Sequence, residues 1–267
     1  MLVNLKPSDK NLCSADYDII ILAGQSNAVG YGKGDVAFTP SENVYLISRN
    51  EEGKRFGKCF WNKNKFYFHP ADKRLNTFTG FYLYFGKEYE KVLLESGRKL
   101  LFLRAAVGGT GFVDKRWGLE DDLYRDAVET AKKLLQVNPK NRIVGILWHQ
   151  GETDVIGGST QSYYHDKLKA LVDGFRAELG MPELPFVAGD MVQEWSVTQP
   201  NAPSIKNATL QVLAEVGTSG YVSSDGLRGN DGNDCIHFSS AANEVFGKRY
   251  FYEFKKVIEN TTKTAEV

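Results

Sequence analysis

The amino-acid sequence predicts an α/β protein in which helices cover both faces of a central, mostly parallel sheet. Short apolar runs recur along the chain, and most are continuously apolar, which is typical of strands buried on both faces. Segments with helical spacing separate these runs, and this alternation indicates a doubly wound, three-layer α/β/α sandwich. The strand-like runs are Ile19–Ala23, Val44–Ile47, Leu100–Val107, Ile143–Trp148, Pro185–Ala188 and, more weakly, Tyr221–Ser223.

Helical segments lie between these runs. In the first of them, Phe81, Phe85 and Tyr89 are spaced by four residues and would share one face of a helix. No repeat, low-complexity tract or linker divides the chain, so we expect one domain over residues 1–267 with its core at about 17–258. The apolar residues of the other predicted helices fall in Leu119–Val137, Tyr164–Phe175, Ala208–Ala214 and Ala241–Ile258.

Residues 49–70 interrupt the pattern with the aromatic, Lys- and Asn-rich stretch FGKCFWNKNKFYFHP. We expect an inserted hairpin that packs its aromatic side chains on the domain. The alternative interpretation is a wall of a substrate cleft, because loops that follow strands often carry binding residues.

The composition argues against a nucleic-acid or membrane-surface protein. Lys plus Arg and Asp plus Glu are both 33, so the formal net charge is zero, whereas such partners favour a basic excess. The polar N-terminus lacks the apolar stretch of a signal peptide. We therefore expect a cytoplasmic protein for the chain as given, or an extracellular or periplasmic one if a leader was removed.

The three cysteines, Cys13, Cys59 and Cys235, are widely spaced and form no CxxC pair. They are expected to be reduced thiols, with one disulfide as the alternative for an exported protein.

Four polar clusters follow strand-like runs or precede the last helix. The first contains Ser26, which the amides of Gln25 and Asn27 flank as candidate supporting residues. Because ligands bind at the carboxyl ends of strands in open α/β sheets, we expect all four clusters to meet at one edge. The other three are GGTG at 108–111, HQGE at 149–152 and DCIH at 234–237.

These clusters contain the parts of a nucleophilic site. A serine hydroxyl such as that of Ser26 attacks an ester only when a neighbouring base takes its proton, and His237 is the candidate base. Asp234, three residues earlier, could orient the imidazole and stabilise its charged form. Glu152 is the alternative acid.

Attack on an ester also creates an oxyanion that needs hydrogen-bond donors. The backbone N–H groups of Ser26 and Gly109, together with the side-chain amide of Gln150, are the candidates. Gly108 is an alternative to Gly109, since both lack a side chain that would block the approach.

The motifs that carry these residues are GQSNAVG at 24–30, GGTGF at 108–112 followed by Trp117, WHQGETD at 148–154 and DCIHF at 234–238. With them the chain resembles the SGNH (GDSL-like) hydrolase superfamily, in particular its sialate O-acetylesterase and acetylxylan esterase branch, carbohydrate esterase family six. Other superfamily members usually have Asn where this branch has Gln150.

The resemblance implies a flavodoxin-like sandwich with a five-stranded sheet and a serine esterase that needs no cofactor. Ser26, His237 and Asp234 would form the catalytic triad, and Ser26, Gly109 and Gln150 the oxyanion hole. The substrate would be a small-molecule or oligosaccharide acetyl ester, such as acetylxylan or an acetylated sialic acid.

Two other functions compete with this interpretation. Gly109-x-Gly111-x-x-Asp114 is a near match to the dinucleotide-binding GxGxxG pattern, with Asp in place of the third glycine. A non-catalytic carbohydrate-binding relative could use the same cleft.

The remaining histidines favour structural roles. His149 follows an apolar strand and is expected to be a hydrogen-bonded structural residue, whereas His69 and His165 are expected at the surface. No HExxH or similar spacing is present, so we expect no metal site. Arg104, inside an apolar run, could pair with Glu152 or point to the strand end.

Overall fold

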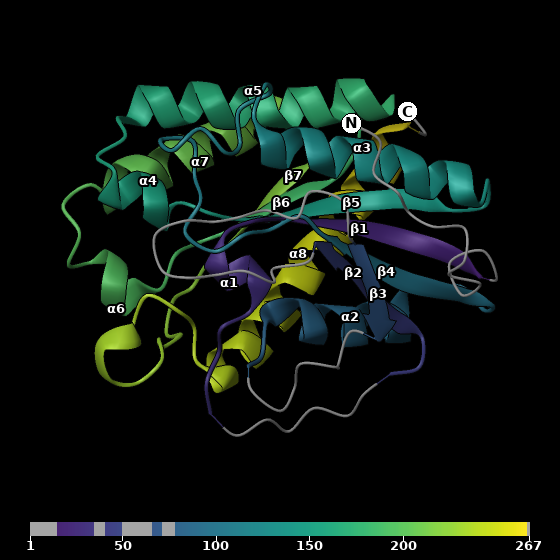
Figure 1. Ribbon diagram of the computed structural model, residues 1–267, viewed down its shortest axis with the longest axis horizontal. Helices are drawn as coiled ribbons and strands as arrows, with labels where there is room; N and C mark the ends of the chain where they lie inside the picture. The colour runs from purple at the N-terminus through teal and green to yellow at the C-terminus, as the bar shows by residue number, and fades with distance from the viewer. Residues whose placement is uncertain (1–14, 35–40, 50–65, 71–77, 266–267) are drawn as a thin grey trace.

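A computed structural model describes residues 15–34, 41–49, 66–70 and 78–265. Its centre is a seven-stranded sheet in the order β3-β2-β4-β1-β5-β6-β7 (Figure 1). All neighbouring strands pair in parallel except β3, which runs antiparallel to β2 at one edge. The strands are β1 (Asp16–Gly24), β2 (Val44–Arg49), β3 (Phe66–Pro70), β4 (Arg98–Arg104), β5 (Arg142–His149), β6 (Phe186–Gly189) and β7 (Ser219–Val222).

The α/β/α sandwich with a mostly parallel sheet is confirmed, but the strand number is not. Five strands, in the order β4-β1-β5-β6-β7, have the arrangement of a flavodoxin-like sheet. The chain between β1 and β4 adds two more strands, β2 and β3, on the β4 edge. The antiparallel pairing of β2 with β3 agrees with the expected hairpin. The aromatic side chains of 49–70, including His69, lie outside the described residues.

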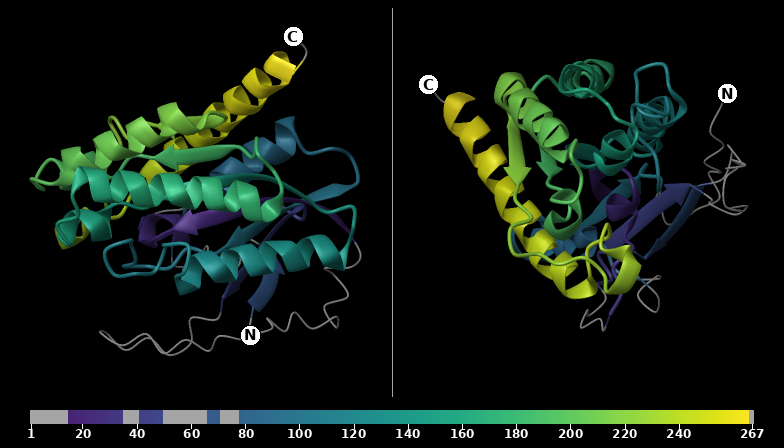
Figure 2. Two further views of the ribbon diagram at one scale, coloured as in Figure 1. Left: turned by 90° about the horizontal axis from the view of Figure 1, so that it is seen from above. Right: turned by 90° about the vertical axis from the view of Figure 1, so that its left-hand side faces the viewer.

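Helices cover both faces of the sheet (Figures 1 and 2). Helices α2 and α8 pack together on one face, and α3, α5 and α7 lie on the other. Three short helices, α1, α4 and α6, directly follow β1, β5 and β6 at their carboxyl ends. The bounds are α1 (Ser26–Val29), α2 (Phe81–Val92), α3 (Asp122–Val137), α4 (Glu152–Ile156), α5 (Gln161–Leu179), α6 (Gln193–Ser196), α7 (Ala202–Val216) and α8 (Ser240–Ala265).

Among the predicted boundaries that differ from the structure, two bear on the site. The expected strand 100–107 ends at Arg104, because Ala105 and Ala106 both donate to the Leu22 carbonyl and so break the regular ladder. The expected helix 119–137 begins only at Asp122. Both differences lengthen the loop after β4, which lies at the carboxyl edge of the sheet.

Aromatic side chains hold α8 against α2 under the sheet. The rings of Phe81 and Tyr250 stack at 4.2 Å, and Phe85 meets Phe254 edge-on at 5.5 Å. Such pairs contribute about 0.5–1.5 kcal/mol each beyond the area they bury. This packing anchors the start of α8, which directly follows the DCIHF motif. None of the described helices has the length and apolarity of a membrane span.

A buried ion cluster joins the amino-terminal ends of three neighbouring strands. Asp18 on β1 is fully buried and accepts hydrogen bonds from Arg98 at 2.7 Å, Arg142 at 2.6 Å and the Tyr89 hydroxyl at 2.8 Å. Burial alone would raise the pKa of Asp18, but the hydrogen bonds from Arg142, Arg98 and Tyr89 outweigh it and lower the pKa below the ordinary value.

We expect Asp18→Asn to lower the free energy of unfolding at pH 7 by about 3 kcal/mol, because it leaves two arginines without their shared anion. Since the folded-state pKa of Asp18 is depressed, its contribution is present above about pH 4 and is lost as the pH falls through the folded pKa. Urea unfolding of wild type and Asp18→Asn between pH 7 and pH 3 measures this difference. A difference that stays constant over that range would contradict the assignment.

Candidate active site

The four predicted clusters lie at the carboxyl edge of the sheet, which faces the viewer in the right panel of Figure 2. At this edge β1 and β5 come unusually close together. Gly24 has φ +121°, and a Cβ there would lie 2.0 Å from the carbonyl oxygen of His149. The next residue, Gln25, donates its N–H to that same carbonyl at 2.8 Å. Only glycine fits at position 24, which explains the abrupt turn that delivers Ser26.

Ser26 opens α1 and is 7% exposed. Its neighbour Asn27 holds the loop of His237 from both sides. The Asn27 Nδ2 donates to the Ile236 carbonyl at 3.0 Å, and its Oδ1 accepts from the Phe238 N–H at 3.1 Å. His237 is therefore fixed in the loop beside Ser26.

The His237 ring is oriented by a carboxylate and an aromatic ring. Its Nδ1 lies 2.5 Å from Oδ1 of Asp234, and Tyr31 stacks on it at 5.2 Å. Lys33 and Asn230 both donate to the other oxygen of Asp234, at 2.6 and 3.0 Å. Partial burial would raise the pKa of Asp234, but the hydrogen bonds from Lys33, His237 and Asn230 outweigh it and lower the pKa below the usual range.

No hydrogen bond joins Ser26 to His237 among the contacts of the described residues. Ser26 and His237 thus lie in neighbouring loops without being in hydrogen-bond contact. Catalytic hydrogen bonds are often long or misaligned before substrate binds and tighten in the complex.

Glu152, the alternative acid, has different partners. It is fully buried, and its Oε1 accepts from Asn27 at 2.7 Å and lies 3.8 Å from Nδ1 of His149. His149 is itself buried and bonds through Nε2 to the Asp190 carbonyl at 2.9 Å, as a structural histidine does. Among the described contacts, Asp234 and not Glu152 reaches His237.

Gln150 is held by three groups. Its Nε2 donates to Asp154 at 2.8 Å and to Gln25 at 3.2 Å, while the Tyr164 hydroxyl donates to its Oε1 at 2.9 Å. The Oε1 of Gln25 also accepts from the Thr153 N–H at 3.1 Å. The Nε2 of Gln25 therefore points away from Thr153 and has no acceptor among the described residues.

Asp154 belongs to this cluster, although the sequence had not singled it out. It is fully buried and accepts from Phe112 N–H at 2.9 Å, Val113 N–H at 3.0 Å and the Ser159 hydroxyl at 2.7 Å, besides Gln150. It thereby fastens the loop after β4 to the loop after β5. The feature of the sequence that could have identified Asp154 is its position at the end of the WHQGETD motif.

The glycines after β4 present free backbone donors. Gly109 is exposed with φ +69°, Gly108 is half-buried, and neither N–H has an acceptor among the described residues. The loop folds back on itself, with Gly111 N–H donating to Asp114 at 2.8 Å. Since α3 begins only at Asp122, this loop lacks the helix N-terminus that a dinucleotide fingerprint places directly after its glycines.

The other singled-out residues lie away from this cluster or serve its frame. Arg104 is buried and its Nη1 is 3.5 Å from the Val29 carbonyl, so it points to the strand end. His165 bridges Asp166 and Glu215 between α5 and α7, and these hydrogen bonds raise its pKa.

Cys235 is a free thiol, whereas the other cysteines lie outside the described residues. In the described ranges, no three His, Cys, Asp or Glu side chains are grouped to hold a metal.

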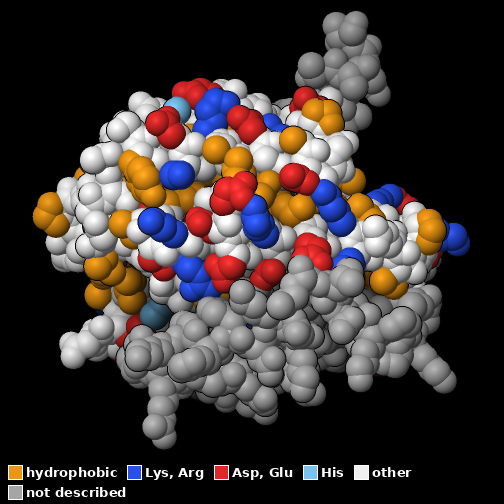
Figure 3. Space-filling model, turned by 45° about the horizontal axis from the view of Figure 1, so that its top comes forward, with side chains coloured by type: hydrophobic (Ala, Val, Ile, Leu, Met, Phe, Trp, Pro, Cys, Tyr) orange, Lys and Arg blue, Asp and Glu red, His pale blue; other side chains and the backbone are white. Residues whose placement is uncertain are grey.

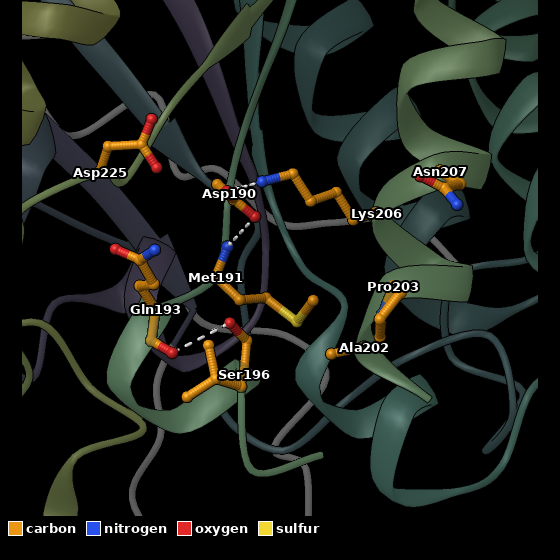
Figure 4. Close-up of a pocket in the computed structure, with 10 residues that line it drawn as sticks. Asp190, Met191, Gln193, Ser196, Ala202, Pro203, Lys206, Asn207 and Asp225 are labelled. Atoms are coloured by element: carbon orange, nitrogen blue, oxygen red, sulfur yellow. Dashed lines mark hydrogen bonds and ion pairs between the residues drawn. The ribbon is translucent and has the colours of Figure 1, made fainter. Parts of the chain in front are cut away.

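A pocket of about 220 Å³ opens beside α6 at the carboxyl ends of β6 and β7 (Figure 4). Asp190 and Lys206 form a 2.6 Å ion pair in its wall. Met191, also in the wall, would lie 3.2 Å from a Cβ on Gly151, so the pocket adjoins the loop after β5. On the face in Figure 3, basic and acidic side chains intermingle rather than separate into patches of one sign.

Comparisons with known proteins agree with this arrangement. A curated Escherichia coli (strain K12) protein, a probable 9-O-acetyl-N-acetylneuraminic acid deacetylase, is 23% identical over 231 residues, covering 70% of each chain. The crystal structure of NanS superposes with a TM-score of 0.72 at 20% identity, over 93% of this chain and 98% of that one. A structure from Arabidopsis thaliana gives a TM-score of 0.68 at 18% identity, over 92% of this chain and 99% of that one. At these identities the structural matches show the shared fold.

The model of one family matches residues 16–256, which run from the first residue of β1 into α8 and include every cluster described above. That family is described as carbohydrate esterase, sialic acid-specific acetylesterase. The chain therefore belongs to this family of carbohydrate acetylesterases and is a carboxylic ester hydrolase.

Proposed function

We propose that the protein is a serine esterase that removes O-acetyl groups from carbohydrate through an acetyl-enzyme on Ser26. The observation that carries the proposal is the 2.5 Å contact of His237 Nδ1 with Asp234, in a loop that Asn27 holds beside Ser26. Acetylated xylan and acetylated sialic acids are the two substrate classes to compare, since the family relationship favours acetylated sugars.

In the first half-reaction, the Ser26 Oγ attacks the acetyl carbonyl carbon while Nε2 of His237 takes its proton. The bond to Asp234 holds the imidazole with its proton on Nδ1, so that Nε2 is the free base, and it stabilises the imidazolium that forms. The tetrahedral intermediate then collapses. The sugar oxygen leaves with the proton from His237, and the acetyl group stays on Ser26.

In the second half-reaction, water attacks the acetyl-serine carbonyl and His237 accepts the proton of the water. Collapse of this intermediate returns that proton to Ser26 Oγ and releases acetate. Each step moves one proton between His237 and an oxygen, so no other acid or base is required.

The oxyanion would be held by N–H groups of Ser26 and Gly109, which have no acceptors among the described residues. Gln150 could join them if its longer bond, 3.2 Å to Gln25, is exchanged for the oxyanion while the 2.8 Å bond to Asp154 stays. The free Nε2 of Gln25 makes that residue a supporting donor. Such preorganised donors stabilise charge that develops only in the transition state.

Ser26→Ala should lower kcat by roughly 10^6, the size of the loss when a triad nucleophile is removed. Hydrolysis of an aryl acetate and acetate release from acetylated xylan and sialic acid measure the effect. A serine-directed phosphonate should label the wild type and not the variant. Labelling at another residue, with activity retained in Ser26→Ala, would overturn the proposal.

Asp234→Asn and Glu152→Gln separate the two candidate acids. Asp234→Asn should lower kcat by about 10^4, because the imidazole loses both its tautomer and its charge partner. Glu152→Gln should act mainly on folding stability, since Glu152 contacts Asn27 and not His237. Both variants are compared by kcat on one aryl acetate, with circular dichroism as the check of folding. A folded but nearly inactive Glu152→Gln, beside an active Asp234→Asn, would reverse the assignment.

Asn27→Ala should lower kcat roughly 100-fold, because a displacement of the His237 loop by about 1 Å is enough for such a loss. It should also lower the melting temperature, since it leaves the buried Phe238 N–H and Glu152 without a partner. The matched control is Asn43→Ala, which removes an exposed asparagine bonded to Glu90. Equal effects of the two substitutions on kcat would show that Asn27 does not position His237.

A further inference from the structure

Lys33 lies against the carboxylate of the proposed triad on the side away from His237. Its Nζ is 2.6 Å from Oδ2 of Asp234, whereas His237 Nδ1 is 2.5 Å from Oδ1. We propose that Lys33 is a positioning residue that acts through Asp234 and extends the activity of the esterase to lower pH. This inference rests on the proposed function, because it requires His237 to be the general base.

The backbone around Lys33 is fixed, so the contact is more than a chance meeting of surface side chains. The Lys33 N–H donates to Oδ1 of Asn230 at 2.8 Å, and Nδ2 of Asn230 donates to Asp234 at 3.0 Å and to the Tyr31 carbonyl at 2.9 Å. Asn230 N–H in turn donates to the His237 carbonyl at 2.7 Å. The segment 31–33 and the loop that carries Asp234 and His237 thus form one hydrogen-bonded unit.

The charge of Lys33 has a defined effect on the base. Asp234 stabilises protonated His237, and a cation on its other oxygen offsets part of that negative charge. With Lys33 in place, the acid limb of the kcat/KM profile should therefore lie at lower pH than without it. Because Lys33 is 56% and Asp234 25% exposed in their side chains, the pair adds little to stability.

Within the described ranges, few other charged or ionisable groups surround His237. Tyr31 stacks on the ring, Cys235 lies two residues before it, and Glu152 of α4 is linked to its loop through Asn27. The charges of Glu194 on α6 and Arg228 in the loop after β7 are paired with each other at 2.7 Å. Lys33 is the lysine in direct contact with Asp234, and its removal therefore tests the charge effect.

The experiment measures kcat/KM on a neutral aryl acetate from about pH 4.5 to 8.5 for wild type, Lys33→Met and Lys33→Arg. Lys33→Met should move the midpoint of the fall in kcat/KM at low pH upward by roughly half a pH unit. A shift of this size is expected for one charge interaction across a few ångströms near the surface. Lys33→Arg keeps the charge and should restore most of the wild-type profile. Salt at about 1 M should move the wild type toward Lys33→Met.

Lys169→Met is the matched control, since it removes an exposed lysine paired with Asp173 at 2.8 Å on α5. Its profile should coincide with that of the wild type. Two results for Lys33→Met would overturn the inference: a pH profile that coincides with that of the wild type, or a kcat/KM that is lower by the same factor at every pH. Either result would leave the proposed function standing. A wild-type enzyme with no acid limb would overturn both.

Discussion

The side-chain amide of Asn27 connects three loops that no other single side chain joins among the described residues. It donates to Glu152 after β5 and to Ile236 after β7, and it accepts from Phe238 on the far side of His237. Because an amide carries both donors and an acceptor, one residue can satisfy all three partners. Its place directly after Ser26 then brings the loops of the proposed nucleophile and base next to each other. Together with the hydrogen bonds that the segment 31–33 makes to Asn230 and Asp234, this contact holds the loop after β7 beside the end of β1.

Asp154 joins the loop after β4 to the loop after β5, as Asn27 joins the loops after β1, β5 and β7. Its buried carboxylate accepts four hydrogen bonds, which come from Gln150, from two consecutive backbone N–H groups of the loop after β4, and from Ser159. A buried carboxylate is costly unless it is filled with donors in this way, so the arrangement resists change. The proposed oxyanion donors on these two loops are thereby fixed in position relative to each other.

Burial separates the carboxylates of the site into two kinds. Glu152 and Asp154 are fully buried and bind amide and hydroxyl donors that hold the loops together. Asp234 is a quarter exposed in its side chain and contacts an imidazole on one oxygen and a lysine on the other. Asp234 is therefore the carboxylate with ionisable partners, whereas Glu152 and Asp154 belong to the internal frame of the site. The proposed triad acid is thus the most solvent-exposed of the three carboxylates.

Much of this organisation was predictable from the chain. Continuous apolar runs predicted the parallel sheet, and the abrupt change from IIILA to GQSN indicated the turn at Gly24 where only glycine fits. The hairpin β2–β3 widened the sheet beyond five strands, because a strand edge accepts further pairing wherever an insertion supplies a suitable segment.

The sequence by itself determined which residue types reach the carboxyl edge of the sheet, because strand ends follow from local patterns of polarity. Only the tertiary structure decided which of them meet. The contacts of Asn27 span 125 to 211 residues, and no local pattern carries such information. Asp234 was the favoured acid because it stands three residues before His237, and the loop after β7 turns it toward that ring. The packing of α4 buries the alternative, Glu152, against Asn27. Distances between loops depend on how the whole sheet and its helices pack, and that is why the contacts of Asn27 with Glu152 and with the loop of His237 appear only in the folded chain.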